Sequence, residues 1–247
     1  FKGDAISTTS ELVKISSDGN LGLEEGQKFE RGGIYRFTVD VTKGNTKAVL
    51  TVEKVGKVDL PAPDIFFGND KMEVTDTDIY KSDQAFTQGQ MITVTGIDNL
   101  NEWWIDPDFF EKQSDGALKF LPINGDYRVT ANAVLKYFSV MALKDGKPAK
   151  LQDDGTGAIW AIGKGIGKPS VASSEVGWEP GKALCLAQVA PKKYQLTLKA
   201  GETLKTSGDP EVISFKFFHQ NDWGGEFGHY ANSILVEQLK LADSGTL

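Results

Sequence analysis

The residues best suited to binding chemistry gather around one short segment, Asp222-Trp223-Gly224-Gly225. Sugar rings present apolar C–H faces and polar edges, so a sugar-binding surface needs an accessible aromatic plane beside hydrogen-bonding groups. The two glycines let the chain turn sharply and leave the Trp223 ring accessible. Polar groups come from the neighbouring residues Lys216, His219, Gln220, Asn221 and Asp222. The alternative is that Trp223 caps a hydrophobic core and the polar residues form a solvated turn.

A second tryptophan in polar surroundings is Trp178, within the loop 173–180. An isolated tryptophan in a loop favours binding, although it can also pack against a neighbouring sheet edge. Trp160 lies in an alternating apolar stretch and is expected in the core. Trp103 and Trp104 are adjacent, so on a strand one of them points inward and the other outward. Trp178 and Trp223 are therefore the predicted stacking platforms.

Catalytic and redox chemistry has few residues to draw on. The only imidazoles are His219 and His229, so any Ser-His-Asp or Cys-His relay must use one of them. These histidines and Asp222 could also bind zinc, but their spacing within a turn favours solvated residues. The single Cys185 excludes an intrachain disulfide and a cysteine-rich metal site, and we expect it to be a strand residue without a redox role.

Two pairs of acidic residues could supply the carboxylates of a glycosidase: Asp106 with Asp108, and Glu175 with Glu179. Acidic residues number 34 among 247, so such pairs are expected by chance. The segment 153–157 offers oxygen ligands for calcium but lacks the downstream glutamate of an EF-hand, which favours a polar turn. The segment 163–168 is glycine-rich without the spacing of a phosphate-binding loop, and we expect a loop beside the ligand. We predict no enzyme activity, no cofactor and no metal.

Composition removes further classes of protein. The chain has 27 basic and 34 acidic residues, a formal net charge of −7, which argues against a nucleic acid partner. It has no run of about 18 apolar residues that would span a bilayer. No signal peptide is visible, and Phe1 in place of a start methionine predicts a processed or truncated chain.

The elements that must position these residues are predicted to be β-strands. Short stretches alternate between apolar and polar residues and are rich in β-branched and aromatic types: 35–41, 48–52, 91–95, 137–141, 194–198 and 213–217. Tyr35 to Val52 is the clearest hairpin, with a Gly-Asn turn. The segment 232–242 is also expected to be a strand. Strands of this length with regular turns predict an all-β fold of tandem Ig-like or carbohydrate-binding-module-like β-sandwich modules.

Internal repeats divide the chain. The segment 11–21 has echoes at 109–118 and 237–247, and Gly33-Ile34-Tyr35-Arg36 has one at Gly125-Asp126-Tyr127-Arg128. Further echoes link 65–68 to 160–163, and 92–103 to 213–223. Several echoes in the same order indicate a tandem β-module.

Three segments follow from this repeat. We expect residues 1–60 to be the back half of a sandwich module, residues 61–150 a complete module, and residues 151–247 a module without its last strands that binds a glycan. We refer to the last two as the middle module and the third module. The chain is either a fragment of something longer, or residues 30–55 complete the third module in a permuted or swapped arrangement. Contacts between Tyr35–Val52 and Ile213–Phe217 would support the second explanation, and their absence would remove it.

The pattern resembles the SusE/SusF-like proteins, surface glycan-binding lipoproteins of Bacteroidetes polysaccharide-utilisation systems. Phe215-Lys216-Phe217, followed by Trp223-Gly224, is similar to a strand and turn of that family. Trp160-Ala161-Ile162-Gly163, followed by Gly177-Trp178, is similar to its module opening, and residues 33–40 to its closing strand. The likeness is strongest over residues 156–228 and weakest over 64–147.

The resemblance implies non-catalytic capture of a polysaccharide or oligosaccharide at the cell outer membrane, beside a glycan transport complex. The protein would be a surface-exposed lipoprotein whose anchor is not in this chain. The binding residues would be Trp178 and Trp223 for stacking, with Lys216, His219, Asn221 and Asp222 for specificity. The alternatives are a structural or adhesive Ig-like repeat without a glycan ligand, and an accessory domain of a glycosidase.

Overall fold

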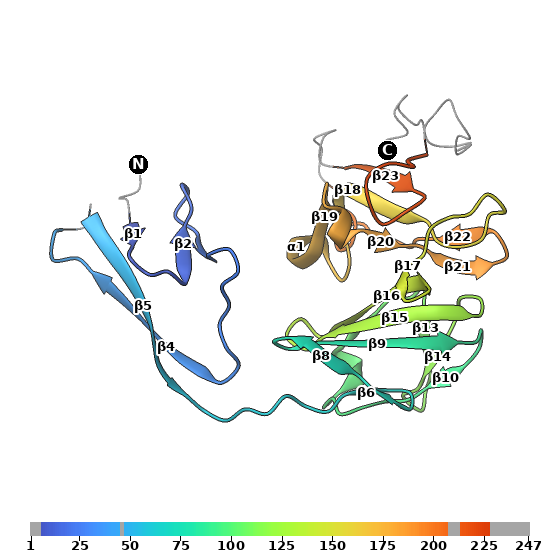
Figure 1. Ribbon diagram of the computed structural model, residues 1–247, viewed down its shortest axis with the longest axis horizontal. Helices are drawn as coiled ribbons and strands as arrows, with labels where there is room; N and C mark the ends of the chain where they lie inside the picture. Colours follow the sequence, from blue (N-terminus) through green and yellow to red (C-terminus); the bar gives the residue numbers. More distant parts are fainter. Residues whose placement is uncertain (1–5, 45–46, 207–212, 228–247) are drawn as a thin grey trace. The chain divides into compact units, whose positions relative to one another are not determined.

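The computed structural model describes residues 6–44, 47–206 and 213–227, and the chain divides into two compact units, residues 1–62 and 63–247 (Figure 1). We call them the N-terminal and the C-terminal unit. The helices among the described residues are short: η2 (Leu100–Glu102), α1 (Val171–Ser174) and η3 (Pro180–Lys182). The predicted all-β, sandwich-like fold is confirmed. The predicted strand at 232–242 lies outside the described residues.

The described residues of the N-terminal unit form a three-stranded sheet and a small hairpin. Its strands are β1 (Ile6–Thr8), β2 (Val13–Ile15), β3 (Leu21–Leu23), β4 (Gly33–Asp40) and β5 (Ala48–Lys57). The sheet order is β1-β5-β4, with β1 parallel and β4 antiparallel to β5, while β2 and β3 pair with each other. The predicted hairpin is confirmed as β4 and β5. Among the residues of this unit that the structure describes, Val13, Leu50 and Val52 form the buried core.

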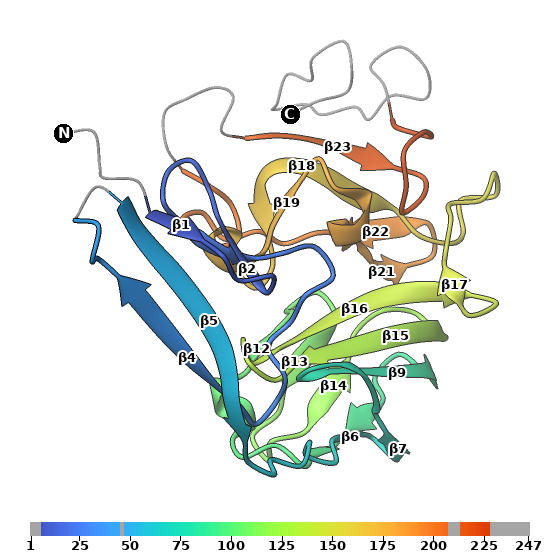
Figure 2. The ribbon, with the colours of Figure 1, turned by 60° about the vertical axis from the view of Figure 1, so that its left-hand side comes forward.

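The middle module is a sandwich built from two groups of strands. The first group is β8 (Glu73–Asp76), β9 (Ile79–Phe86), β12 (Trp104–Ile105), β15 (Gly125–Asn132), β16 (Tyr137–Lys144) and β17 (Lys147–Pro148). The second is β6 (Phe66–Phe67), β7 (Asp70–Lys71), β10 (Met91–Ile92), β11 (Val94–Thr95), β13 (Phe110–Lys112) and β14 (Leu118–Phe120). The first group forms one sheet in the order β12-β16-β15-β9-β8, with β17 on β16, and its long strands lie side by side in Figure 2.

Aromatic residues fill the space between these groups of strands. Alternating side chains of β9, β15 and β16 point inward because successive residues of a strand face opposite sides. Phe138 lies 5.3 Å from Phe67, and Phe86 lies 4.9 Å from Phe120, between ring centroids. Trp103 is buried and stacks on Phe138, whereas Trp104 is half-buried, so the adjacent tryptophans differ in exposure as expected, although only Trp104 lies on a strand. This core continues into the third module, because one cluster of buried residues extends from Ile65 to Phe218.

The third module is arranged around one long strand. Its strands are β18 (Trp160–Gly167), β19 (Glu175–Gly177), β20 (Leu184–Cys185), β21 (Ala187–Ala190), β22 (Lys193–Gln195) and β23 (Ser214–Phe218). β18 pairs with β19, β20 and β23, and β21 pairs with β22. Trp160 is completely buried, which confirms its predicted place in the core.

Three sequence predictions need correction here. The glycine-rich segment 163–168 is not a loop, because most of it belongs to β18, where glycines allow neighbouring strands to approach closely. The predicted strand 194–198 has strand pairing only to Gln195. The predicted strand 91–95 is interrupted at Thr93 and divides between two sheets as β10 and β11.

Candidate functional site

Strand β18 positions both predicted platform tryptophans. At its centre Gly163 pairs with Phe215 of β23 and with Gly177 of β19. A strand residue with two partners has one on each edge, so β19 and β23 flank β18. Trp178 therefore follows one neighbour of β18 directly, and Trp223 lies in the turn that follows the other.

Gly163 is required for this arrangement. Its φ is +148°, and a Cβ atom there would lie 2.2 Å from the Ser214 carbonyl oxygen and 2.3 Å from the Phe215 Cα. Any other residue would push β23 away from β18. The glycine-rich sequence thus serves the close pairing that brings the two tryptophan-bearing segments together.

The two predicted platforms contact each other. The Trp178 and Trp223 rings stack with centroids 6.3 Å apart and planes at 25°. Trp178 is half-buried and packs against the core, while Trp223 is 51% exposed and also meets the edge of Phe218, at 6.0 Å between centroids. The structure therefore combines the two readings of Trp223, because the ring covers core residues and still presents an open surface.

The turn that carries Trp223 is fixed by its own hydrogen bonds. The amide of His219 donates to the Gly225 carbonyl (2.8 Å), and the side-chain amide of Gln220 donates to the Trp223 carbonyl (2.6 Å). Asp222 Oδ1 accepts from the Trp223 amide at 2.7 Å, so this oxygen shapes the turn. Such a rigid turn holds the indole in place before any ligand arrives.

Three other predicted residues offer polar groups near this turn. His219 Nε2 and Asn221 Oδ1 are buried, and neither has a hydrogen-bond partner among the described residues. Lys216 is half-buried, makes no ion pair with any described residue, and shares a face of β23 with Phe218 because strand residues alternate. Buried polar atoms are normally satisfied, so these groups are candidates for contacts with a bound molecule.

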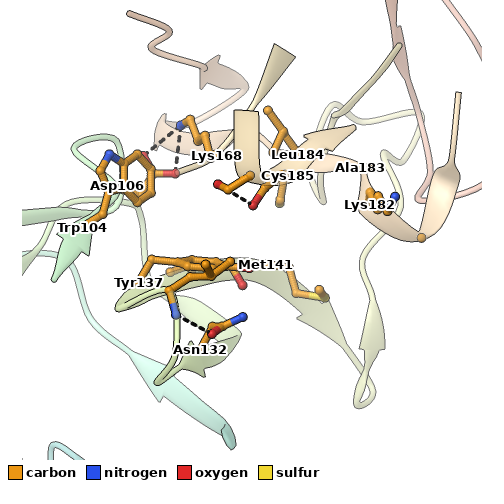
Figure 3. Close-up of a pocket in the computed structure, with 16 residues that line it drawn as sticks. Trp104, Asp106, Asn132, Tyr137, Met141, Lys168, Lys182, Ala183, Leu184 and Cys185 are labelled. Carbon is orange, nitrogen blue, oxygen red and sulfur yellow. Dashed lines mark hydrogen bonds and ion pairs between the residues drawn. The ribbon is translucent and has the colours of Figure 1, made fainter. Parts of the chain in front are cut away.

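A second concave feature lies between the middle and third modules, within the C-terminal unit (Figure 3). It is a groove of about 420 Å³. Trp104 and Tyr137 sit opposite each other on the parallel strands β12 and β16 and line one side, and Leu184 and Cys185 of β20 line the other. The sequence indicated that one of two adjacent tryptophans is accessible, but it gave no sign of this groove.

Buried charges close one end of the groove. Lys168 Nζ donates to both Asp106 carboxylate oxygens at 2.8 and 2.9 Å, and to Asp108 at 3.0 Å. Asp108 also accepts from the amide and hydroxyl of Thr197, both at 2.6 Å, and from Gln195 at 2.8 Å. These bonds join the middle module to the third. They hold both carboxylates in ion pairs and hydrogen bonds between the two modules.

The two aspartates differ in pKa although they share one lysine. Burial raises the pKa of Asp106, and the charge of Lys168 only partly offsets it. Burial also acts on Asp108, but the charge of Lys168 and the hydrogen bonds from Thr197 and Gln195 outweigh it and lower the Asp108 pKa. Asp108 is thus the carboxylate that the surrounding groups hold in its charged form.

The other residues considered for catalysis or redox chemistry are also held by ion pairs and hydrogen bonds, or are buried. Glu175 accepts from the Gly165 amide and from Lys205, and Glu179 pairs with Lys182. Burial raises the pKa of Cys185 to about 12, which leaves its thiol protonated and unreactive. Within residues 6–44, 47–206 and 213–227, no three His, Cys, Asp or Glu side chains gather as metal ligands would.

Two family profiles match the chain. One, described as a domain of unknown function (DUF5125), matches residues 58–151. The other, described as a domain of unknown function (DUF5121), matches residues 1–42 and 154–247, together more than half of the chain. The chain belongs to the DUF5121 family. Both platform tryptophans lie in the second DUF5121 segment.

The same DUF5121 profile thus matches sequence on both sides of the DUF5125 region. No curated protein and no solved structure matches the chain. Among the described residues, no helix has the length and apolar character needed to cross a membrane.

Proposed function

We propose that this DUF5121 chain binds a polysaccharide or oligosaccharide without catalysing its breakdown. The observation that carries the proposal is the half-exposed Trp223 ring, stacked on Trp178 and held by a rigid turn. A sugar ring would pack its C–H face on the exposed indole. Lys216, His219 and Asn221 would then meet the hydroxyl groups at the polar edge of the sugar.

The surrounding chemistry supports binding rather than turnover. Glycoside hydrolysis needs two carboxylates that can reach one glycosidic bond. Asp106 and Asp108 are instead buried on Lys168, and Glu175 is paired with Lys205. The resemblance to SusE/SusF-like proteins supports the same assignment, and extends it to a lipoprotein at the bacterial outer membrane beside a glycan transporter.

The test is affinity electrophoresis against a panel of soluble α- and β-linked polysaccharides. We expect Trp223→Ala to abolish retardation by the recognised glycan, because removing one stacking ring weakens binding by at least about tenfold, or ~1.4 kcal/mol. Trp178→Ala should act in the same direction by removing the support of Trp223. Near-UV circular dichroism and a melting curve check that both variants stay folded.

Trp104→Ala is the matched control, since it removes a half-buried tryptophan from the groove rather than from the stacked pair. Retained binding in both Trp223→Ala and Trp178→Ala, with loss in Trp104→Ala, would move the site to the groove. Retention in all three would contradict both locations.

The competing function is a structural or adhesive repeat, favoured by the contact of Trp223 with the core residue Phe218. In that case the tryptophan pair is only a cap on the sandwich. Tryptophan emission separates the two functions: a recognised glycan shifts the emission if Trp223 stacks on sugar, and the whole panel leaves it unchanged if the pair is a cap.

A further inference from the structure

The N-terminal unit repeats the topology of the second half of the middle module. In both, a short strand runs parallel to the last strand of an antiparallel hairpin: β1 on β5 beside β4, and β12 on β16 beside β15. Both also contain a small hairpin, β2–β3 or β13–β14, closed by the same turn bonds around Gly19 and Gly116. The N-terminal unit is therefore half of a sandwich.

The inward face of this half is open. On β15, Val129 and Ala131 are completely buried. At the equivalent places of β4, Phe37 is 49% and Val39 is 53% exposed. β4 is moreover the last strand of its sheet, so its outer backbone edge has no strand partner among the described residues. An apolar face on an unpaired edge strand is a surface built for strand addition.

In the middle module the covering element is β9, which pairs with β15 along its whole length. The third module contains the equivalent of β9. The β21–β22 hairpin has the same register shift as β8–β9 and the same left-handed turn residue, Lys192 in place of Asp78, both with φ of 60°. β9 continues to Phe86, whereas β22 ends at Gln195.

Beyond β22 the third module has an edge of its own that faces no described strand. Residues 196–199 pair with no strand among the described residues. The Thr197 amide is directed at Asp108, so the backbone groups of Leu196 and Leu198 face the opposite edge. Tyr194, Leu196 and Leu198 alternate as half-buried residues packed on the core, in the manner of β9.

We propose that β4 of one chain adds to this edge in a second copy of the same chain, and that the exchange is reciprocal. The occupant is identified by complementarity, since β4 and the open edge both lie in segments that the DUF5121 profile matches. The β9–β15 register carries over to pairs of Tyr35 with Leu198, Arg36 with Thr197, Phe37 with Leu196, Thr38 with Gln195, Val39 with Tyr194, and Asp40 with Lys193. Apolar residues meet on the inward face, and opposite charges meet at the end. This inference concerns assembly and is independent of glycan binding.

The first test is the mass of the 247-residue chain in solution by light scattering. We expect twice the 26.9 kDa of one chain. The double variant Phe37→Glu/Val39→Glu should give the mass of one chain, because it places charges on the inward face. Thr38→Glu is the matched control on the outward face and should keep the doubled mass. Far-UV circular dichroism checks that all the variants fold.

The second test is a disulfide between chains. Gln195 lies two residues before Thr197, so its backbone N–H and C=O point the same way as those of Thr197, away from the proposed β4 partner. Thr38 and Gln195 would therefore form a non-hydrogen-bonded pair. Their Cα atoms would be about 4.5 Å apart, which is within disulfide range. Chains carrying Thr38→Cys and chains carrying Gln195→Cys, coexpressed with different tags, should give a two-chain band under oxidation. Thr38→Cys with Lys199→Cys, displaced by four residues or about 13 Å, should not.

The outcomes are distinct. A one-chain product that forms only when Thr38→Cys and Gln195→Cys are in the same chain would overturn the second copy as the occupant. The absence of any disulfide, together with a one-chain mass for the unmodified protein, would overturn the pairing itself. Loss of glycan binding in the tryptophan variants with the doubled mass retained would leave this inference standing.

Discussion

The hairpins β15–β16 and β4–β5 share a sequence pattern and a topology but differ in what covers them. Both contain Gly-x-Tyr-Arg, and in both the glycine lies against the tyrosine ring. β15 pairs with β9 and closes over an aromatic core, whereas β4 leaves Phe37 and Val39 exposed. The Gly-x-Tyr-Arg pattern therefore specifies the hairpin itself. Burial of the hairpin's apolar face requires strands from the other half of the module.

The largest difference in stability between the two hairpins should come from replacing an aromatic residue that is buried in one hairpin and exposed in the other. Phe138→Ala in β16 should lower the free energy of unfolding of the C-terminal unit by about 3–5 kcal/mol, because it opens a cavity in a filled core. Phe37→Ala in β4 should change the free energy of unfolding of the N-terminal unit little under conditions that keep chains apart. Urea denaturation measures both. Equal losses in the two variants would mean that Phe37 is as well covered as Phe138.

The next largest difference should be between a buried and an exposed ion pair. Lys168→Ala should cost about 3 kcal/mol or more, since it leaves Asp106 and Asp108 buried without their cation. Lys54→Ala in the N-terminal unit, which removes an exposed partner of Glu30, should leave the denaturation curve unchanged. A small loss for Lys168→Ala would show that water reaches the cluster through the groove.

The tyrosines of the Gly-x-Tyr-Arg pattern should differ less in how much their hydroxyl groups contribute to stability. The Tyr127 hydroxyl donates to the Ile123 carbonyl at 2.9 Å, so Tyr127→Phe should cost about 1 kcal/mol. Tyr35 instead accepts from the exposed Glu30 amide, which water can satisfy when the hydroxyl is removed. Paired thermal melts of Tyr127→Phe and Tyr35→Phe measure the difference. A larger loss in Tyr35→Phe would reverse the order.

The smallest effect concerns pH. The hydrogen bond from Arg128 holds the pKa of Asp83 below its usual 3.8, so this pair stabilises the fold above that pH and ceases to do so as pH falls through the lowered pKa. The pair is partly exposed and is worth about 0.5 kcal/mol. Asp83→Asn should therefore flatten the loss of stability as pH falls below about 4. An unchanged slope would contradict the assignment.

The local elements could be predicted from sequence because their causes are local. Alternation located the β4–β5 hairpin, and the flanking apolar residues placed Trp160 in the core. Alternation misled at residues 196–198, where the apolar pattern continues but no described strand pairs. Apolar–polar alternation indicates which side chains face inward, but it does not indicate whether another strand lies alongside.

The candidate site depended on contacts between distant residues and could be predicted only in part. Trp178 and Trp223 were nominated separately, but their stacking follows from how β19 and β23 both pair with β18. The glycine run 163–168 predicts a flexible loop, and this prediction is wrong because the glycines permit tight strand pairing at Gly163. The groove beside Trp104 and the cation shared by two aspartates gave no sequence signal, since both arise where the middle and third modules meet.

The stacked Trp178–Trp223 pair has an optical consequence. Two indoles with centroids 6.3 Å apart are close enough for their electronic transitions to couple, which should produce a paired positive and negative band in the far-ultraviolet circular dichroism spectrum. Either tryptophan alone would not produce this couplet. The protein thus contains its own chromophore pair, which reports the spacing of β19 and β23 without any label and would register any ligand that shifts Trp223.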